Sequence, residues 1–163
     1  MRTPLAVVAI AVLALTGCSF DAPPAVPTMN SAEAINEYQQ LYGDIEAAMS
    51  SADVGELQLD SLHSLVPQDD DPLLCGLWLG RVSSSDEIEI ANARADEFVA
   101  LIDPILANHG WPALVFVKHE NGPGYPDYES ELEDGTANVG LSIRGGRVTA
   151  SVFTFVTDDP CDP

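Results

Sequence analysis

Histidine and cysteine are the residues of this chain best suited to catalysis or metal binding, and neither falls into a known catalytic spacing. The sequence has three of each. It contains no G-x-S-x-G, P-loop, H-E-x-x-H or C-x-x-C motif. His63 and His109 lie on separate segments, and we expect both at the surface. His119 and Glu120 follow a predicted strand and precede a glycine-rich loop, where they could form an acid–base pair of a hydrolase.

Two clusters of aspartates could bind Ca²⁺ if the fold brought them together. One cluster precedes Cys75 and the other surrounds Cys161, so a bond between these cysteines would gather six carboxylates. Carboxylate oxygens are preferred Ca²⁺ ligands, but the spacing does not match an EF-hand loop. A solvated acidic rim is therefore the simpler interpretation, and a Ca²⁺-stabilised structural module is an alternative. The aspartates are Asp69, Asp70, Asp71, Asp158, Asp159 and Asp162.

The basic residues include one notable pair, Arg144 and Arg147, which we expect to face each other at the tip of a hairpin. Like charges directly opposite each other in a sheet are unfavourable. We expect carboxylates such as Glu129, Glu131 or Glu133 to neutralise them, although an anionic partner would do so as well.

The overall composition restricts the possible partners. The chain has 163 residues, 46% of them hydrophobic, and a formal charge of −20 from 26 acidic and 6 basic residues. This length and hydrophobic fraction suit one folded domain and argue against a wholly disordered chain. Too few basic residues are present to neutralise a nucleic-acid backbone or to dock on anionic lipid, so we exclude both kinds of partner.

The N-terminal residues have the features of a targeting segment. Arg2 precedes an apolar stretch over residues 5–15. As a helix this stretch would rise only about 16 Å, roughly half the thickness of a bilayer core. We therefore expect residues 1–17 to form a signal peptide rather than a membrane-spanning anchor.

The tetrapeptide LTGC, which ends at Cys18, follows the apolar stretch directly. It resembles the lipobox of bacterial lipoproteins. The resemblance implies cleavage after Gly17, a diacylglycerol on the Cys18 thiol and a lipid-anchored position on the extracytoplasmic face of the cell membrane. An ordinary secreted protein, cleaved elsewhere and with Cys18 as a free thiol, is the alternative.

Residues 18–29 join this anchor to the rest of the chain. They include three prolines and show no helical pattern, so they would extend to about 35 Å as a spacer. A plain disordered terminus without a spacing role fits the composition equally well.

If Cys18 is acylated, Cys75 and Cys161 remain as an even pair in an exported chain. Such a pair favours a disulfide, which would tie the middle of the chain to its C-terminus. Two free thiols that lie too far apart to bond are the alternative.

Two amphipathic helices are predicted. Asn30 and Glu33 have the spacing of a capping box, and we expect the first helix to run to about Met49. The second helix should follow the serines at 83–85 and end at the Asn-His-Gly of 108–110. Its predicted core-facing stripe comprises Ile88, Ala91, Ala95, Phe98, Ile102 and Ile105. Pro104 should kink this helix near its end or cap a new short turn.

The remaining segments predict strands. Residues 73–82 suit a short buried strand, and residues 113–118 are apolar on both faces, which favours an interior strand. Residues 129–133 suit an acidic edge strand. Residues 56–66 fit a strand or a helix.

The clearest local pattern is a hairpin formed by residues 138–144 and 147–157 around Gly145 and Gly146, two positions that tolerate positive φ. One face would then pair Ile143 with Val148, Leu141 with Ala150, and Val139 with Val152.

On the other face of this hairpin, Phe153 and Phe155 would need a cover. We expect the first helix or the loop at Tyr125 and Tyr128 to provide it; otherwise the two rings form an exposed binding patch. Residues 30–163 are thus predicted to form a single two-layer α+β domain, with two helices on one face of a mostly antiparallel sheet that ends in the hairpin.

The lipobox, the mid-chain cysteine, the Gly110-Trp111 pair after a helix, the hairpin and the C-terminal cysteine together resemble small actinobacterial lipoproteins of the LppA-like kind. This resemblance implies an extracytoplasmic α+β domain with one disulfide and no assigned activity. The absence of catalytic motifs, together with the expected lipid tether, predicts a non-catalytic domain that binds a protein or cell-envelope ligand. A cell-envelope hydrolase is the alternative, and we identify no catalytic residues, metal site or cofactor.

Overall fold

Helix α1 (Ser31–Ser51) begins where the capping-box spacing predicts. The Asn30 side chain accepts a hydrogen bond from the Glu33 N–H, and the Glu33 carboxylate accepts one from the Asn30 N–H, both at 3.0 Å. One face of α1 is buried in the core through Ala34, Tyr38, Leu41, Ile45 and Met49. The computed structural model describes residues 26–60, 63–67, 75–85, 88–118, 126–157 and 161.

Helix α2 (Ala95–Asn108) begins later than predicted, because the serines before it pair with the hairpin instead of capping a helix. The Ser84 N–H donates to the Val148 carbonyl at 2.9 Å, and the Ser84 hydroxyl accepts from the Val148 N–H at 3.1 Å. The Ile90 N–H donates to the carbonyl of Gly146. The chain therefore follows the hairpin tip before a short 3₁₀ turn, η1 (Asn92–Arg94), leads into α2.

The predicted stripe of α2 is correct only from Ala95 onward. Ile88 and Ala91 precede the helix, whereas Ala95, Phe98 and Ile102 are buried together with Leu106. The helix passes through Pro104, and the chain turns at Gly110, whose φ is +78°.

In the described residues, seven strands form one open, antiparallel sheet with the order β1-β3-β7-β6-β5-β4, and β2 also pairs with β3. The ambiguous residues 56–66 thus contribute strands rather than a helix. The strands are β1 (Gln58–Asp60), β2 (Ser64–Pro67), β3 (Cys75–Ser83), β4 (Val115–Phe116), β5 (Asp127–Glu131), β6 (Ala137–Arg144) and β7 (Arg147–Val156).

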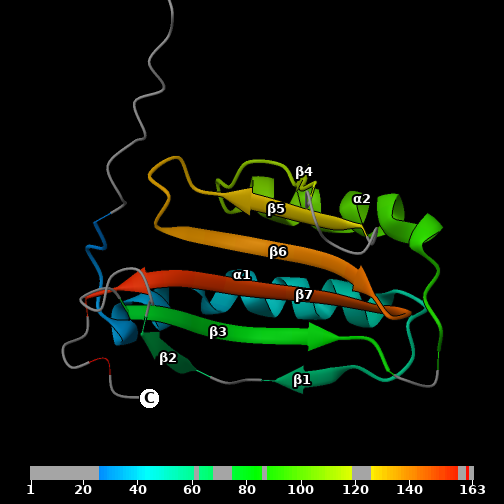
Figure 1. The fold of residues 1–163 in the computed structure, drawn as a ribbon, viewed down its shortest axis with the longest axis horizontal. Coiled ribbons are helices and arrows are strands. Elements are labelled where there is room, and N and C mark those ends of the chain that lie inside the picture. The colour runs from blue at the N-terminus through cyan, green and yellow to red at the C-terminus, as the bar shows by residue number, and fades with distance from the viewer. Residues whose placement is uncertain are drawn as a thin grey trace, which may run out of the picture.

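Both described helices cover the same face of the sheet, and Figure 1 shows them behind it. Helix α1 contacts β3 and β7, and α2 contacts β6. The predicted two-layer α+β class is confirmed, and so is the hairpin register, which joins Ile143 to Val148, Leu141 to Ala150 and Val139 to Val152.

Two strand predictions are wrong in position. The segment predicted as an interior strand is the short edge strand β4, with Val115 and Phe116 exposed by 66% and 55%. Only Leu114 of this segment points into the core, and its N–H donates to the Asp103 carboxylate of α2 at 2.9 Å. The acidic strand predicted at the edge is β5, which β4 separates from the edge.

The predicted disulfide is present between Cys75 and Cys161, whose Cα atoms lie 5.6 Å apart. It joins the start of β3 to the segment after β7, and Cys75 is buried. Close by, the Thr157 N–H donates to the Met29 carbonyl at 2.8 Å, so the chain enters and leaves the domain at the same corner.

Candidate functional site

The face of the sheet opposite the helices carries polar side chains in three rows that cross the strands. The middle row joins Arg81 on β3, Ser151 on β7, Gly140 on β6 and Glu129 on β5 through successive strand pairs. The two neighbouring rows consist of Ser83, Thr149, Ser142 and Asp127, and of Trp78, Phe153, Asn138 and Glu131. We call this surface the outer face.

A β-bulge in β3 places Trp78 and Arg81 on the outer face together. In a regular strand, residues three positions apart point to opposite faces. Here the register shifts between Trp78 and Gly80, so that Leu79 and Gly80 both face the helices. Leu79 is buried in the core, and a Cβ on Gly80 would lie 2.6 Å from the Tyr42 ring of α1.

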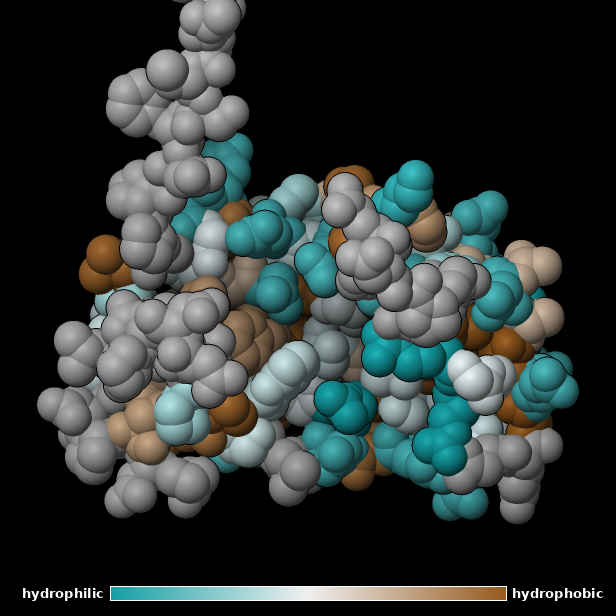
Figure 2. Space-filling view, in the orientation of Figure 1, coloured by the Kyte–Doolittle hydropathy of each residue, from teal (hydrophilic) through white to brown (hydrophobic). Residues whose placement is uncertain are grey.

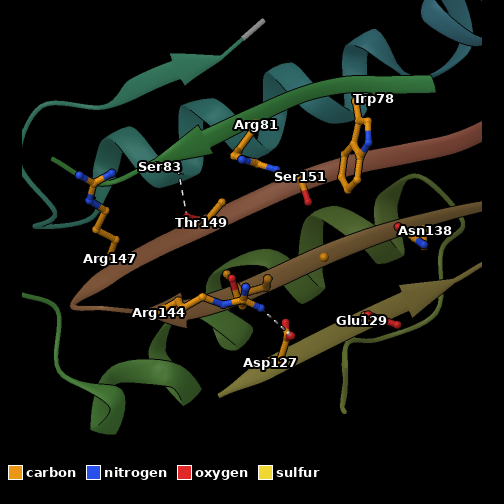
Figure 3. Close-up of a pocket in the computed structure, with 13 residues that line it drawn as sticks. Trp78, Arg81, Ser83, Asp127, Glu129, Asn138, Arg144, Arg147, Thr149 and Ser151 are labelled. Atoms are coloured by element: carbon orange, nitrogen blue, oxygen red, sulfur yellow. Dashed lines mark hydrogen bonds and ion pairs between the residues drawn. The ribbon is translucent and has the colours of Figure 1, made fainter. Parts of the chain in front are cut away.

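The outer face is hollowed into a groove of about 410 Å³, which we call the outer-face groove (Figure 3). In Figure 3 the side chains of β3, β5, β6 and β7 stand around it. Its lining comprises Trp78, Arg81, Ser83, Asp127, Glu129, Asn138, Gly140, Leu141, Ser142, Arg144, Arg147, Thr149 and Ser151. Seven of these side chains carry a hydroxyl, amide or carboxylate, so the groove offers both donors and acceptors of hydrogen bonds.

Two charged residues of the groove, Arg81 and Glu129, lie on opposite walls. Arg81 is on β3 and lies over the Trp78 ring, with its guanidinium carbon 5.8 Å from the ring centroid. Glu129 is exposed on β5, and among the described residues neither it nor Arg81 forms an ion pair. Arg144, at the hairpin tip, lies 3.8 Å from the Asp127 carboxylate.

The predicted pair of arginines is thus opposed as expected, since Arg144 and Arg147 are cross-strand partners. Arg144 forms an ion pair with Asp127, which is not one of the three glutamates named as examples from the sequence. Ser83 and Thr149 share a hydrogen bond of 3.0 Å between them, visible in Figure 3.

Gly140 lies on the groove floor without a local structural need for glycine. Its backbone does not have a positive φ, and an added Cβ would meet only the Ser151 hydroxyl, at 3.3 Å. Glycine in the interior of a strand weakens it and often marks a site where a ligand approaches closely. A side chain at this position would fill the middle of the groove.

Aromatic rings form one end of the outer face. Trp78 and Phe153 lie with ring centroids 4.9 Å apart, and Phe153 and Phe155 at 5.2 Å. The two phenylalanines are therefore covered by Trp78 and by each other. The first helix and Tyr128, which were expected to cover them, lie on the helix side of the sheet, so this part of the prediction is wrong. The other residue named for the cover, Tyr125, is outside the described residues. Figure 2 shows tan and brown side chains at the left of this face and mostly teal ones across its middle, with further brown ones at the right edge.

None of the other predicted site residues that the structure describes lines the groove. His109 bonds to the Asp44 carboxylate at 2.8 Å and connects the two helices, and His63 precedes β2. His119, Glu120, Gly17, Cys18 and the aspartates at 69–71, 158, 159 and 162 lie outside the described residues. Within the described ranges, no group of three or more histidine, cysteine or acidic residues could hold a metal ion.

The titratable groups with altered pKa values lie away from the groove lining. Burial raises the pKa of Tyr38 and of Tyr42 on α1. Hydrogen bonds from Arg94 lower the pKa of Glu97, and those from Thr136 lower the pKa of Asp134.

The sequence alone did not reveal the site because the four residues of its middle row, Arg81, Glu129, Gly140 and Ser151, are eleven to seventy positions apart and no local motif contains them. The predicted hairpin register, when it is extended to the other face, pairs Gly140 with Ser151 as observed. The bulge that adds Trp78 and Arg81 has no clear sequence signal beyond Gly80. No helix in the described part of the chain has the length and apolar character needed to cross a membrane. Comparison of the chain with protein-family models, with curated proteins and with solved structures found no match.

Proposed function

We propose that this chain is a lipid-anchored, extracytoplasmic, non-catalytic domain that binds a cell-envelope ligand in the outer-face groove. The apolar residues 5–15 and the LTGC sequence ending at Cys18 support the anchor. The disulfide between Cys75 and Cys161 supports an oxidising location.

The observation that carries the binding function is the groove itself. It lies on the sheet face opposite α1 and α2, it is lined by paired donors and acceptors beside Trp78, and its floor is lowered at Gly140. Concave sites with a few convergent polar groups and an aromatic wall are typical of ligand-binding surfaces.

Trp78 provides the signal for a binding test. We suggest the lipid-free domain, residues 26–163, with Trp111→Phe, so that Trp78 is the sole tryptophan. A soluble cell-wall digest should change Trp78 fluorescence in a saturable way, and Gly140→Leu should abolish the change. Because the proposed domain is non-catalytic, the digest should be recovered chemically unchanged after incubation with the protein.

Gly43→Leu is the matched control, because Gly43 is exposed on α1 and a Cβ there meets no atom within 4 Å. This variant should respond like the parent. An equal response of Gly140→Leu would refute binding in the outer-face groove.

The anchor has its own test. When expressed in a bacterium that processes lipoproteins, the full chain should incorporate labelled palmitate, and Cys18→Ala should not. Equal labelling of both proteins, or an intact signal segment in the mass spectrum of the wild-type chain, would refute lipid attachment at Cys18.

A further inference from the structure

We propose that the ligand is a short zwitterionic peptide that lies across the strands, with its carboxylate at Arg81 and its ammonium group at Glu129. This inference rests on the proposed function and specifies the chemistry of the ligand in the outer-face groove.

The row from Arg81 to Glu129 has the geometry of a two-ended site. Arg81, Ser151, Gly140 and Glu129 are consecutive partners on four adjacent strands, so the two charged residues are separated by three strand spacings. At about 4.8 Å per spacing this is roughly 14 Å. An extended peptide of four residues has about the same length, at 3.3–3.6 Å per residue.

The two ends have opposite charge and are both accessible. Arg81 and Glu129 are exposed, and neither forms an ion pair among the described residues. Arginine binds carboxylates through paired N–H groups, and a carboxylate accepts hydrogen bonds from an ammonium group. In Figure 3 Arg81 lies toward Trp78 and Ser151, along the groove rather than away from the sheet.

The charge of the whole chain favours a zwitterion over a simple ion. Three arginines line the groove, but the formal charge of −20 on the whole chain repels, at long range, a ligand that carries only negative charge. A ligand with only positive charge is attracted to many acidic surfaces and gains nothing specific from Arg81. A zwitterion has no net charge, and it satisfies both ends of the row.

The middle of the row suits a peptide backbone. Gly140 leaves space for the chain, and the side chains of Ser151, Thr149 and Asn138 offer hydrogen bonds to its N–H and C=O groups. Trp78, beside Arg81, provides an apolar contact for a side chain near the carboxylate end.

The test combines changes in the protein with changes in the ligand. Tetra-alanine with free termini, its N-acetylated form and its C-terminal amide are titrated by NMR into the ¹⁵N-labelled domain, residues 26–163. Arg81→Gln should weaken binding of free tetra-alanine about tenfold, as for the loss of one charge-assisted hydrogen bond, and should leave binding of the amide unchanged. Glu129→Gln should weaken the free peptide equally and leave the acetylated form unchanged.

Two substitutions outside the described groove lining control for charge alone. Lys118→Gln matches Arg81→Gln, and Glu37→Gln, on α1, matches Glu129→Gln. Both should bind all three peptides like the parent. All four residues are exposed, so the variants are expected to fold, and a thermal melt of each variant checks this.

The inference and the proposed function fail in different ways. If capped and free peptides bind alike, or if free tetra-alanine shifts no resonance of the row at millimolar concentration, the zwitterionic ligand is refuted. The fluorescence comparison of Gly140→Leu with Gly43→Leu, which uses no peptide, then still decides whether the groove binds an envelope ligand.

Discussion

At the scale of single residues, Gly80 connects the core with the outer-face groove. Its missing side chain makes room for the Tyr42 ring of α1, whose hydroxyl lies 3.4 Å from the Arg81 carbonyl. Because Gly80 and Leu79 both face the helices, the strand can present Trp78 and Arg81 on the same side. The close approach of a helix thus stabilises the bulge on which the groove depends.

We therefore predict that Gly80→Ala destabilises the fold by about 1–2 kcal/mol, since its Cβ would displace the Tyr42 ring. Gly43→Ala, in the open middle of α1, should instead stabilise it by about 0.5–1 kcal/mol. Urea denaturation measures both. In a Tyr42→Ala background, Gly80→Ala should no longer destabilise the fold. If it still does, the Tyr42 ring is not the cause of the destabilisation.

Asp134 lies in the turn between β5 and β6, and we predict that its carboxylate stabilises the fold in a pH-dependent way. The Thr136 hydroxyl and N–H donate to its carboxylate at 2.6 and 3.0 Å, and they lower the pKa of Asp134. A carboxyl group whose pKa is lowered on folding stabilises the fold above its unfolded pKa, and this stabilisation is lost as the pH falls through the folded value.

Asp134→Asn should therefore be less stable than the wild type at pH 7, and the difference should shrink as the pH falls below about 4. Thermal melts between pH 2.5 and 7 measure it. Glu133→Gln removes the same charge from the neighbouring residue and serves as the control. A difference that stays constant down to pH 2.5 would contradict the role of the ionised carboxylate.

At the scale of elements, the hairpin of β6 and β7 organises the sheet. Both residues of its turn have positive φ, +60° at Gly145 and +79° at Gly146. The turn also packs against the segment before α2, because a Cβ on Gly146 would lie 3.0 Å from the Glu89 side chain. The two glycines therefore have unequal surroundings.

Because the surroundings of Gly145 and Gly146 differ, we predict that the two positions tolerate substitution to different degrees. Gly145→Asn should leave stability nearly unchanged, because asparagine tolerates positive φ and no atom lies within 4 Å of the added Cβ. Gly146→Ala should lower the free energy of unfolding by about 1–2 kcal/mol through backbone strain. The close approach of its Cβ to the Glu89 side chain should destabilise the fold further. Equal urea midpoints for the two variants would contradict this description of the turn.

The elements also show what could be predicted from the sequence. The capping box of α1 and the alternation of the hairpin depend on neighbouring residues, and both predictions are confirmed. The start of α2 was misplaced because Ser84 bonds to Val148, a partner 64 residues away. Apolar composition likewise did not distinguish the edge strand β4 from an interior strand.

At the scale of the whole molecule, the arginines of the hairpin tip lie at the opposite end of β7 from the point where the chain enters the domain. Arg81, Arg144 and Arg147, half of the six basic residues, lie in the outer-face groove of a strongly acidic chain. Strand β7 leads from the hairpin tip to the Met29 carbonyl over ten residues, or roughly 30 Å. A tether that ends at Met29 would hold the basic end of the groove away from the membrane.

The disulfide connects this whole arrangement, because it joins the start of β3 to the C-terminal segment across 86 residues. In the chain-entropy model a loop of this length contributes about 4–5 kcal/mol. The double variant Cys75→Ala/Cys161→Ala should therefore lose about this much stability, and a reducing agent should destabilise the wild type but not the variant. Urea unfolding with and without dithiothreitol measures both effects. Equal midpoints for the variant and the oxidised wild type would show that the hydrogen bond between Thr157 and Met29 and the core contacts of β7 suffice to hold the termini together.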